Sequence, residues 1–261
     1  MSTTKGLEGI VAAESKISSI INDQLTYVGY TIDDLAEHAS FEEVVFLLWF
    51  KRLPNKNELA KFDEELFENM TISNAIVEHF KSYDIHNVHP MAALRTAISL
   101  LGLYDSEADD MSDEANNRKA IRLQAKVAAI VSAFSRIRDG KEVVQPKKGL
   151  SYAANFLYML NGKEPIDLEV EAINKALVLH ADHELNASTF TARVCVATLS
   201  DIYSGITSAI SALKGPLHGG ANEAVMNMLL EIGEVDNAIP YIKDKMANKR
   251  KNYGYGGAPS L

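Results

Sequence analysis

Helical periodicity dominates this chain. From residue 40 onward, apolar residues recur at the three- and four-residue spacing of amphipathic or buried helices, in one segment after another. No strands alternate with these segments, which argues against a doubly wound parallel sheet. Residues 6–31 differ, because they are rich in Ile, Val, Tyr and Thr and are broken by glycines, a pattern typical of short strands. The sequence therefore predicts an all-α fold with a small N-terminal β segment. Helices are expected over residues 41–51, 57–68, 91–103, 120–137, 151–160, 187–213, 221–231 and 240–248, with a further one opening near Pro165 and Asp167.

Two of these helices carry more detailed predictions. Ser40 followed by Glu43 fits a capping box at the start of the helix over 41–51. Residues 187–213 consist mainly of Ala, Ser, Thr and Val, and they predict one continuous helix of about seven turns, ended by Pro216. Small side chains permit close approach of backbones, so this helix is expected to be central and crossed by others.

The segment 91–117 divides into an apolar and an acidic part. Residues 91–103 carry Ala, Leu and Ile on nearly every side, so this helix is expected either to be buried all round or to pair with a second subunit. Residues 104–117 are acidic and are expected to be solvated.

Composition narrows the classes of function. The chain has 261 residues, and 26 Lys and Arg against 35 Asp and Glu give a net charge of −9. This balance argues against nucleic-acid binding, because phosphate contacts need clustered cations. Cys195 is the one cysteine, so neither a disulfide framework nor a cysteine-rich zinc site is expected, and a reducing cytoplasm is the expected compartment. The apolar run over 44–50 is too short to span a membrane, and no signal peptide is expected.

Residues 180–184, His-Ala-Asp-His-Glu, crowd two imidazoles and two acids at a helix end. The spacing of His180 and His183 could present both to one metal ion, but no third ligand is evident nearby. A polar pocket for an anionic organic acid is favoured, because paired imidazoles can donate hydrogen bonds to carboxylates. His180 also continues an apolar stripe with Ile173 and Leu177, which suits a buried structural histidine.

The segment 215–223, Gly-Pro-Leu-His-Gly-Gly-Ala-Asn-Glu, is the most informative. Pro216 fixes a bend, and Gly219 and Gly220 let the backbone and a substrate approach closely. His218 then lies just before a helix, whose positive end disfavours imidazolium and so holds a neutral ring that can donate from one nitrogen. Such a ring can polarise a carbonyl, although a glycine-rich turn with an incidental histidine is the alternative for this segment by itself.

Two motifs together resemble the citrate synthase family, in its shorter bacterial form. They are residues 179–189, LHADHELNAST, and residues 213–223, LKGPLHGGANE, with further matches at 6–10, 27–36 and 89–91. The resemblance covers residues 6 to about 249. It implies an all-α homodimer that condenses acetyl-CoA with oxaloacetate and water, giving citrate and CoA, as an acyltransferase of the tricarboxylic acid cycle without a cofactor or metal.

The resemblance also implies roles for individual residues. His218 is expected to hydrogen-bond the thioester carbonyl of acetyl-CoA and to stabilise the enol. His183 is expected to bind oxaloacetate, with Asn186 lining the same pocket. CoA contacts are assigned to a glycine-tyrosine-glycine run at Gly254, Tyr255 and Gly256.

The C-terminal residues depart from the family pattern. Gly257 and Ala258 stand where a histidine and an arginine are expected, and the aspartate that removes the methyl proton would lie further on. The sequence therefore predicts a large helical domain over 1–217, with its extended segment over 1–31, and an incomplete small domain over 218–261 with an aberrant tail at 250–261. We expect a truncated chain, read out of frame near Arg250, that is inactive alone.

Alternative functions remain open at this level. Condensation of propionyl-CoA to 2-methylcitrate is the enzymatic alternative, because acyl-chain choice depends on a pocket volume that sequence does not display. A non-catalytic helical fragment that dimerises through residues 91–103 and 120–137 is the second. Metal binding at His180 and His183 is the third.

Overall fold

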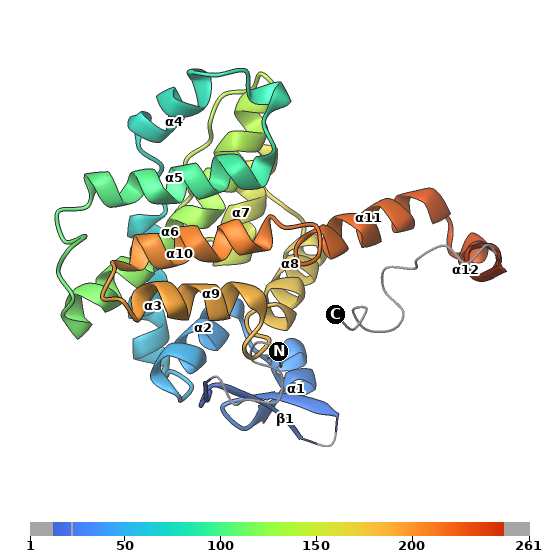
Figure 1. Ribbon diagram of the computed structural model, residues 1–261, viewed down its shortest axis with the longest axis horizontal. Helices are drawn as coiled ribbons and strands as arrows, with labels where there is room; N and C mark the ends of the chain where they lie inside the picture. The colour runs from blue at the N-terminus through green and yellow to red at the C-terminus, as the bar shows by residue number, and fades with distance from the viewer. Residues whose placement is uncertain (1–12, 22, 248–261) are drawn as a thin grey trace, which may run out of the picture.

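A computed structural model of the chain describes residues 13–21 and 23–247, which form twelve α-helices, three strands and two short 3-10 helices (Figure 1). The predicted all-α fold with a small N-terminal β segment is confirmed for this part of the chain. The helices are α1 Ile32–His38, α2 Phe41–Phe50, α3 Lys56–Asn69, α4 Asn74–Lys81, α5 Pro90–Tyr104, α6 Asp113–Arg138, α7 Tyr152–Asn161, α8 Asp167–Leu179, α9 Ala187–Val196, α10 Ile202–Leu213, α11 Gly220–Ile232 and α12 Ala238–Ala247. The 3-10 helices are η1 Ile85–Asn87 and η2 Val235–Asn237.

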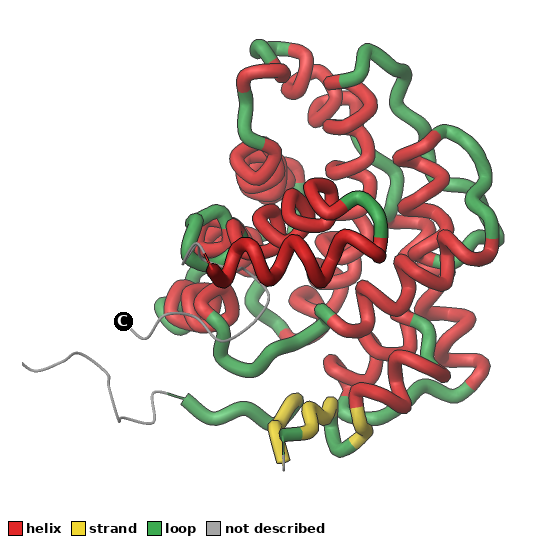
Figure 2. Tube along the Cα trace, turned by 90° about the vertical axis from the view of Figure 1, so that its right-hand side faces the viewer, coloured by secondary structure: helices red, strands yellow, loops and turns green. Residues whose placement is uncertain are grey.

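The small sheet lies at one end of the helical body (Figure 2). Its strands are β1 Ser18–Ile21, β2 Gln24–Tyr27 and β3 Tyr30–Thr31, paired antiparallel in that order. A tight turn joins β2 to β3, and it needs positive φ at Val28 (51°) and at Gly29 (89°), a backbone conformation that glycine adopts at little cost. Tyr27, the last residue of β2, is fully buried, so the sheet is anchored to the helices by that ring.

Helix α2 lies in the core, where it packs against α3, α7 and α8. Its predicted capping box is confirmed: Ser40 Oγ accepts from the Glu43 amide at 3.2 Å, and Glu43 Oε2 accepts from the Ser40 amide at 2.8 Å. Val44 and Leu47 on the same helix are fully buried. The long helix α6 runs through the same core, where its Phe134 packs edge-on against Phe80 of α4 at a ring-centroid distance of 5.6 Å.

The single helix predicted over 187–213 is wrong, because the segment folds into the two adjacent helices α9 and α10. Leu199 adopts a left-handed φ of 65°, and Asp201 then caps α10 by accepting from the Ser204 amide at 2.9 Å. The predicted close approach is present between these two helices: a Cβ on Gly205 of α10 would lie 2.6 Å from Val196 Cγ1. The small-residue composition thus reflects a tight helical hairpin.

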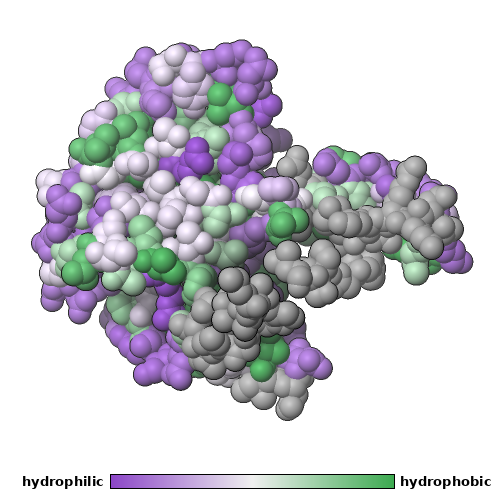
Figure 3. All heavy atoms as spheres, in the orientation of Figure 1, coloured by the Kyte–Doolittle hydropathy of each residue, from purple (hydrophilic) through white to green (hydrophobic). Residues whose placement is uncertain are grey.

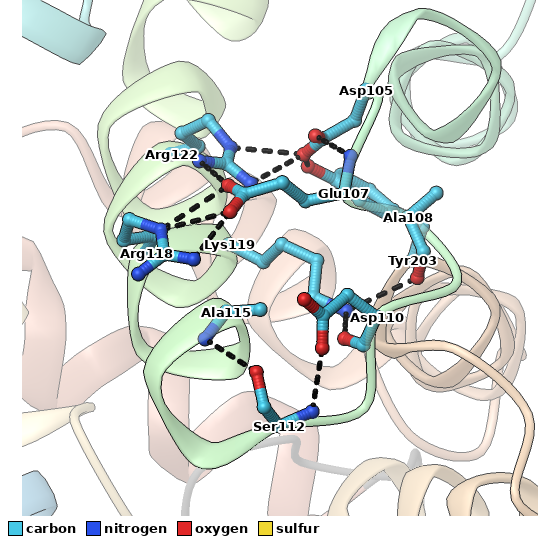
Figure 4. Close-up of polar contacts among 10 residues, drawn as sticks. All are labelled: Asp105, Glu107, Ala108, Asp110, Ser112, Ala115, Arg118, Lys119, Arg122 and Tyr203. Carbon is cyan, nitrogen blue, oxygen red and sulfur yellow. Dashed lines mark hydrogen bonds and ion pairs between the residues drawn. The ribbon is translucent and has the colours of Figure 1, made fainter.

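The prediction that the acidic segment 104–117 is solvated is only partly right, because several of its polar groups bond to α6 and α10 (Figure 4). Arg122 of α6 donates from Nε to Asp105 Oδ2 at 2.9 Å and pairs through Nη1 with Glu107 Oε2 at 2.9 Å, and Tyr203 of α10 donates to the same Asp105 oxygen. Burial alone would raise the pKa of Asp105, but these bonds and one from the Glu107 amide hold it below its usual value. Lys119, fully buried, donates to the backbone carbonyls of residues 108 and 110 at 3.1 and 2.6 Å. The acidic segment therefore pins α6 to α5 and α10.

The C-terminal end of α5 is exposed. Leu103 and Tyr104 are 80% and 65% accessible, while Ala97 and Ile98 of the same helix are fully buried. The helix is therefore not buried all round. Figure 3 shows small patches of apolar side chains at this end of the molecule, near α5, α9 and α10.

Helices α11 and α12 project from the helical body (Figure 1). The turn over 214–219 joins α10 to α11 and contains Pro216, where the sequence predicts a bend. The division into domains at 217 and 218 stays a prediction, and the tail over 250–261 lies outside the described residues. Among those described, no helix combines the length and the apolarity that crossing a bilayer requires.

Candidate functional site

The loop between α8 and α9 carries the first histidine motif. His180 caps the C-terminus of α8, and its Nδ1 lies 2.7 Å from the Ala176 carbonyl oxygen. It is exposed, so the buried position expected for it is wrong, although its hydrogen bond to the helix is present. His183 is exposed in the following loop.

Asn186 begins α9. Its Oδ1 accepts from the amides of Ser188 and Thr189, both at 3.0 Å, and its Nδ2 donates to Thr189 Oγ1 at 3.1 Å. The side chain is therefore a helix N-cap, and one N–H of its amide is left over for another contact. Because this cap fixes the end of the loop, it also fixes the segment on which His183 lies.

The second motif forms the turn between α10 and α11. His218 lies two residues before α11, as the sequence predicts. The backbone of the turn leaves no room for a side chain at Gly219. Its amide donates to the Leu213 carbonyl at 2.9 Å, and a Cβ there would lie 2.1 Å from that oxygen. Gly220 meets only an ordinary contact, with Pro216 Cβ at 3.7 Å. The sequence predicts that both glycines let a substrate approach closely. At Gly219, however, the space of a side chain is already filled by Leu213 of the same chain.

One hydrogen bond joins the two motifs. Ser188 Oγ, in the first turn of α9, lies 2.8 Å from His218 Nε2 and 3.1 Å from the Ala209 carbonyl oxygen of α10. The hydroxyl has a single hydrogen and can donate it to one of these acceptors. If it donates to Nε2, a neutral His218 carries its own proton on Nδ1; if it donates to Ala209, the neutral ring carries the proton on Nε2.

The structure thus brings His218 and Asn186 to the two sides of Ser188, while His183 lies in the loop immediately before them. The binding roles predicted for His183 and Asn186 and the catalytic role of His218 stay predictions. Gly254, Tyr255 and Gly256, assigned to CoA contacts, lie outside the described residues. Within the part of the chain that is described, no group of three or more His, Cys, Asp or Glu side chains is placed to hold a metal ion.

Two residues of the site were missed by sequence reasoning. Ser188 was overlooked because a serine in the first helical turn is ordinary, and its contact with His218 spans 30 residues. Tyr27 was noted only within a motif, but its hydroxyl donates to the Asp182 carbonyl at 2.8 Å, across 155 residues. Burial raises the pKa of this phenol, so it stays protonated and able to donate.

Comparison with known proteins gives consistent matches. The family profile described as "Citrate synthase, C-terminal domain" matches residues 6–258. The chain is 68% identical to citrate synthase 2 of Bacillus subtilis over 98% of its own length and 69% of that protein's. It is 44% identical to a 2-methylcitrate synthase of Mycobacterium tuberculosis, over 97% of the chain and 64% of that protein.

Solved structures agree with the sequence matches. Citrate synthase from Thermoplasma acidophilum, solved as a ternary complex with carboxymethyl coenzyme A and oxaloacetate, superposes with a TM-score of 0.87 at 30% identity, over 98% of this chain and 68% of that one. Citrate synthase from Pyrobaculum aerophilum superposes with a TM-score of 0.84 at 39% identity, over 98% and 64%.

Proposed function

Because the chain belongs to the citrate synthase family of acyltransferases, we propose that its site is built for the condensation of acetyl-CoA with oxaloacetate. In this reaction the methyl group of acetyl-CoA loses a proton, the resulting enol carbon attacks the ketone carbon of oxaloacetate, and water cleaves the thioester to give citrate and CoA. The observation that supports this best is the hydrogen bond between Ser188 and His218, which joins the two family motifs into one site.

His218 serves as the electrophilic group in this proposal. Its Nε2 is taken by Ser188, so Nδ1 is the nitrogen left to meet a substrate. When the Ser188 hydrogen points to Nε2, Nδ1 carries the ring proton and donates to the thioester oxygen, on which negative charge develops as the enol forms. A neutral imidazole N–H suits this step, because it can donate a hydrogen bond to the developing oxyanion while keeping its proton.

His183 and Asn186 bind oxaloacetate in this proposal. His183 is accessible in its loop, and imidazole N–H groups donate well to carboxylates. The free N–H of the Asn186 amide supplies a second donor from the start of α9, where backbone amides also favour an anion. Both contacts are hydrogen bonds, and neither requires a metal ion.

Acetyl-CoA is the proposed acyl donor, ahead of propionyl-CoA. The support is the higher identity to a citrate synthase, 68%, than to a 2-methylcitrate synthase, 44%. One methylene in a pocket changes binding by only about 1–3 kcal/mol, so few residues decide this choice.

We further propose that the chain associates as a homodimer and works in the cytoplasm. The exposed Leu103 and Tyr104 at the end of α5 and the exposed Leu199 between α9 and α10 support a partner surface. Between α9 and α10, next to Leu199, lies an apolar cavity of about 510 Å³ whose wall includes Met111 and Val196. Free Cys195 suits a reducing compartment.

Binding of oxaloacetate tests the proposal directly. Calorimetric titration of the purified chain is expected to show one oxaloacetate site, and His183→Ala is expected to weaken it by at least about tenfold. The matched control is His86→Ala, which removes an exposed histidine of η1. Absence of binding by the unaltered chain, or equal affinity in both variants, would contradict the proposal.

Turnover is a separate measurement. Gly257 and Ala258 stand where the family pattern has a histidine and an arginine, so the ketone of oxaloacetate lacks a polarising partner from these positions. Thiol release from acetyl-CoA with oxaloacetate is therefore expected to stay below detection. A turnover of about 1 s⁻¹ or more, as in ordinary enzymes, would show that these positions are dispensable.

Competition between acetyl-CoA and propionyl-CoA for the oxaloacetate-bound chain separates the two acyl donors, and a clear preference for propionyl-CoA would favour 2-methylcitrate synthesis.

A further inference from the structure

The hydroxyl of Tyr27 links the N-terminal sheet to the histidine loop. It donates to the Asp182 carbonyl at 2.8 Å, with the Val178 carbonyl oxygen at 3.3 Å, and it accepts from the Asp182 amide at 3.1 Å. Tyr27 is fully buried, and its ring ends β2. One side chain therefore satisfies both backbone groups of the residue that precedes His183.

The loop has no regular structure of its own over residues 181–186, so such contacts decide its shape. Within it, Glu184 adopts a left-handed φ of 53°, a conformation that costs energy for a residue with a Cβ. Asp182 Oδ2 accepts from the Glu184 amide at 2.9 Å and supports that turn. The conformation of Glu184 thus depends on Asp182, and Asp182 depends on Tyr27.

The two ends of the loop are fixed independently. On the α8 side, Asn174 accepts from the Phe41 amide at 2.8 Å and donates to the Ala39 carbonyl at 3.1 Å, which holds α8 against α1 and α2. On the α9 side, Asn186 caps the helix. Between these two ends, the backbone of Asp182 is held by its hydrogen bonds with the distant Tyr27 hydroxyl.

We propose that Tyr27 is a positioning residue for His183: its hydroxyl holds the backbone of Asp182 so that the imidazole of the next residue is preorganised to bind a dicarboxylate. This inference rests on the proposed role of His183 in oxaloacetate binding. It assigns the N-terminal sheet a function, because β2 delivers the hydroxyl. Removing the hydroxyl leaves the Asp182 amide and carbonyl without this partner in a partly buried place, and the loop gains alternative conformations.

Tyr27→Phe tests the inference, because it removes only the hydroxyl and keeps the buried ring. Oxaloacetate affinity, measured by calorimetry on the full chain, is expected to fall roughly tenfold. Hydrogen exchange of the backbone amides over 181–186 is expected to accelerate, and bound oxaloacetate is expected to slow it again.

Tyr152→Phe is the matched control. Tyr152 is also a buried tyrosine, and its hydroxyl donates to the Gln124 carbonyl at 2.8 Å and not to the loop backbone. This variant is expected to lose comparable stability while keeping oxaloacetate affinity and slow exchange over 181–186.

The outcomes separate this inference from the proposed function. Unchanged affinity and unchanged exchange in Tyr27→Phe would overturn the inference while leaving the proposed function intact. Equal losses in Tyr27→Phe and Tyr152→Phe would also overturn it, because the effect would then be one of general stability. If the unaltered chain fails to bind oxaloacetate, the proposed function falls, whereas exchange over 181–186 still reports whether Tyr27 holds the loop.

Discussion

The helical body up to α10 and the projecting pair α11 and α12 are built differently. In the body, side chains such as Phe80 and Ile98 are fully buried, and a polar network fastens α5, α6 and α10. In the projecting part, Leu230 of α11 and Val235 of η2, which joins α11 to α12, are 72% and 88% accessible. The free energy of folding therefore resides in the body, and the turn with His218 lies where the two regions join.

The largest expected effect contrasts the two regions. Phe80→Ala is expected to lower the free energy of unfolding by about 3–5 kcal/mol, because it opens a cavity in a packed core. Leu230→Ala in α11 is expected to change it by less than about 0.5 kcal/mol, because the side chain already lies in solvent. Urea denaturation measures both. A large loss in Leu230→Ala would show that α11 is packed in solution and would break the contrast.

The next effect concerns the junction itself. Gly219→Ala is expected to cost about 1–3 kcal/mol, because its Cβ would lie 2.1 Å from the Leu213 carbonyl oxygen and the turn must open. Gly220→Ala is the control and is expected to be nearly neutral, since its Cβ would meet only an ordinary contact. Thermal unfolding compares the two. If both variants behave alike, the turn over 214–219 is not tightly closed.

A smaller effect sharpens the picture of His218. Ser188→Ala removes the partner of Nε2 and is expected to cost about 1 kcal/mol of stability. The ratio of the two neutral tautomers, read from the ¹⁵N shifts of the His218 ring, is expected to change with it. Ser211→Ala, which removes an exposed hydroxyl bonded to the Thr207 carbonyl in α10, is expected to leave those shifts alone.

The smallest effect is electrostatic and belongs to the body. Partial desolvation in the groove that Asp63 shares with Glu42 and Glu43, together with the charges of those two residues, raises the pKa of Asp63 to about 6. The folded state therefore holds this proton more tightly than the unfolded state, so the penalty is absent at low pH and develops as pH rises from about 4 to about 6.

Asp63→Asn removes that penalty. It is expected to stabilise the chain above pH 6 by less than about 1 kcal/mol, since Asp63 is exposed and water screens its charge. Urea denaturation at pH 4 and pH 7.5 checks this, with Asp109→Asn as the control that loses the same charge elsewhere on the surface. An equal gain at both pH values would contradict the explanation.

Much of the fold follows from local sequence. The capping box at Ser40 and Glu43 is a short-range signal, and it set the start of α2 correctly. The break at Leu199 was missed because the residues around it favour helix, while the hairpin is decided by packing between Gly205 and Val196. The acidic segment was misjudged for a related reason: Asp105 finds Arg122 and Tyr203 only after distant helices pack.

The candidate site shows the same division. His218 and its turn could be located from the sequence, because proline and glycine fix that backbone within a few residues. The helix cap at Asn186 was within reach of the same reasoning, but its neighbour Ser188 was not, because its partners lie 21 and 30 residues away. Tyr27 lies further still from Asp182 along the chain, so only the folded topology shows their contact.

The bond between Ser188 and His218 closes the open end of the hairpin formed by α9 and α10, whose other end is closed by the connection through Leu199. Since Ser188 belongs to α9 and the turn with His218 follows α10, sliding of one helix along the other would shift the imidazole. Gly205 and Val196 pack close to that connection, so a methyl group added at Gly205 would push α9 and α10 apart there. The displacement would reach the imidazole of His218 at the other end of the hairpin.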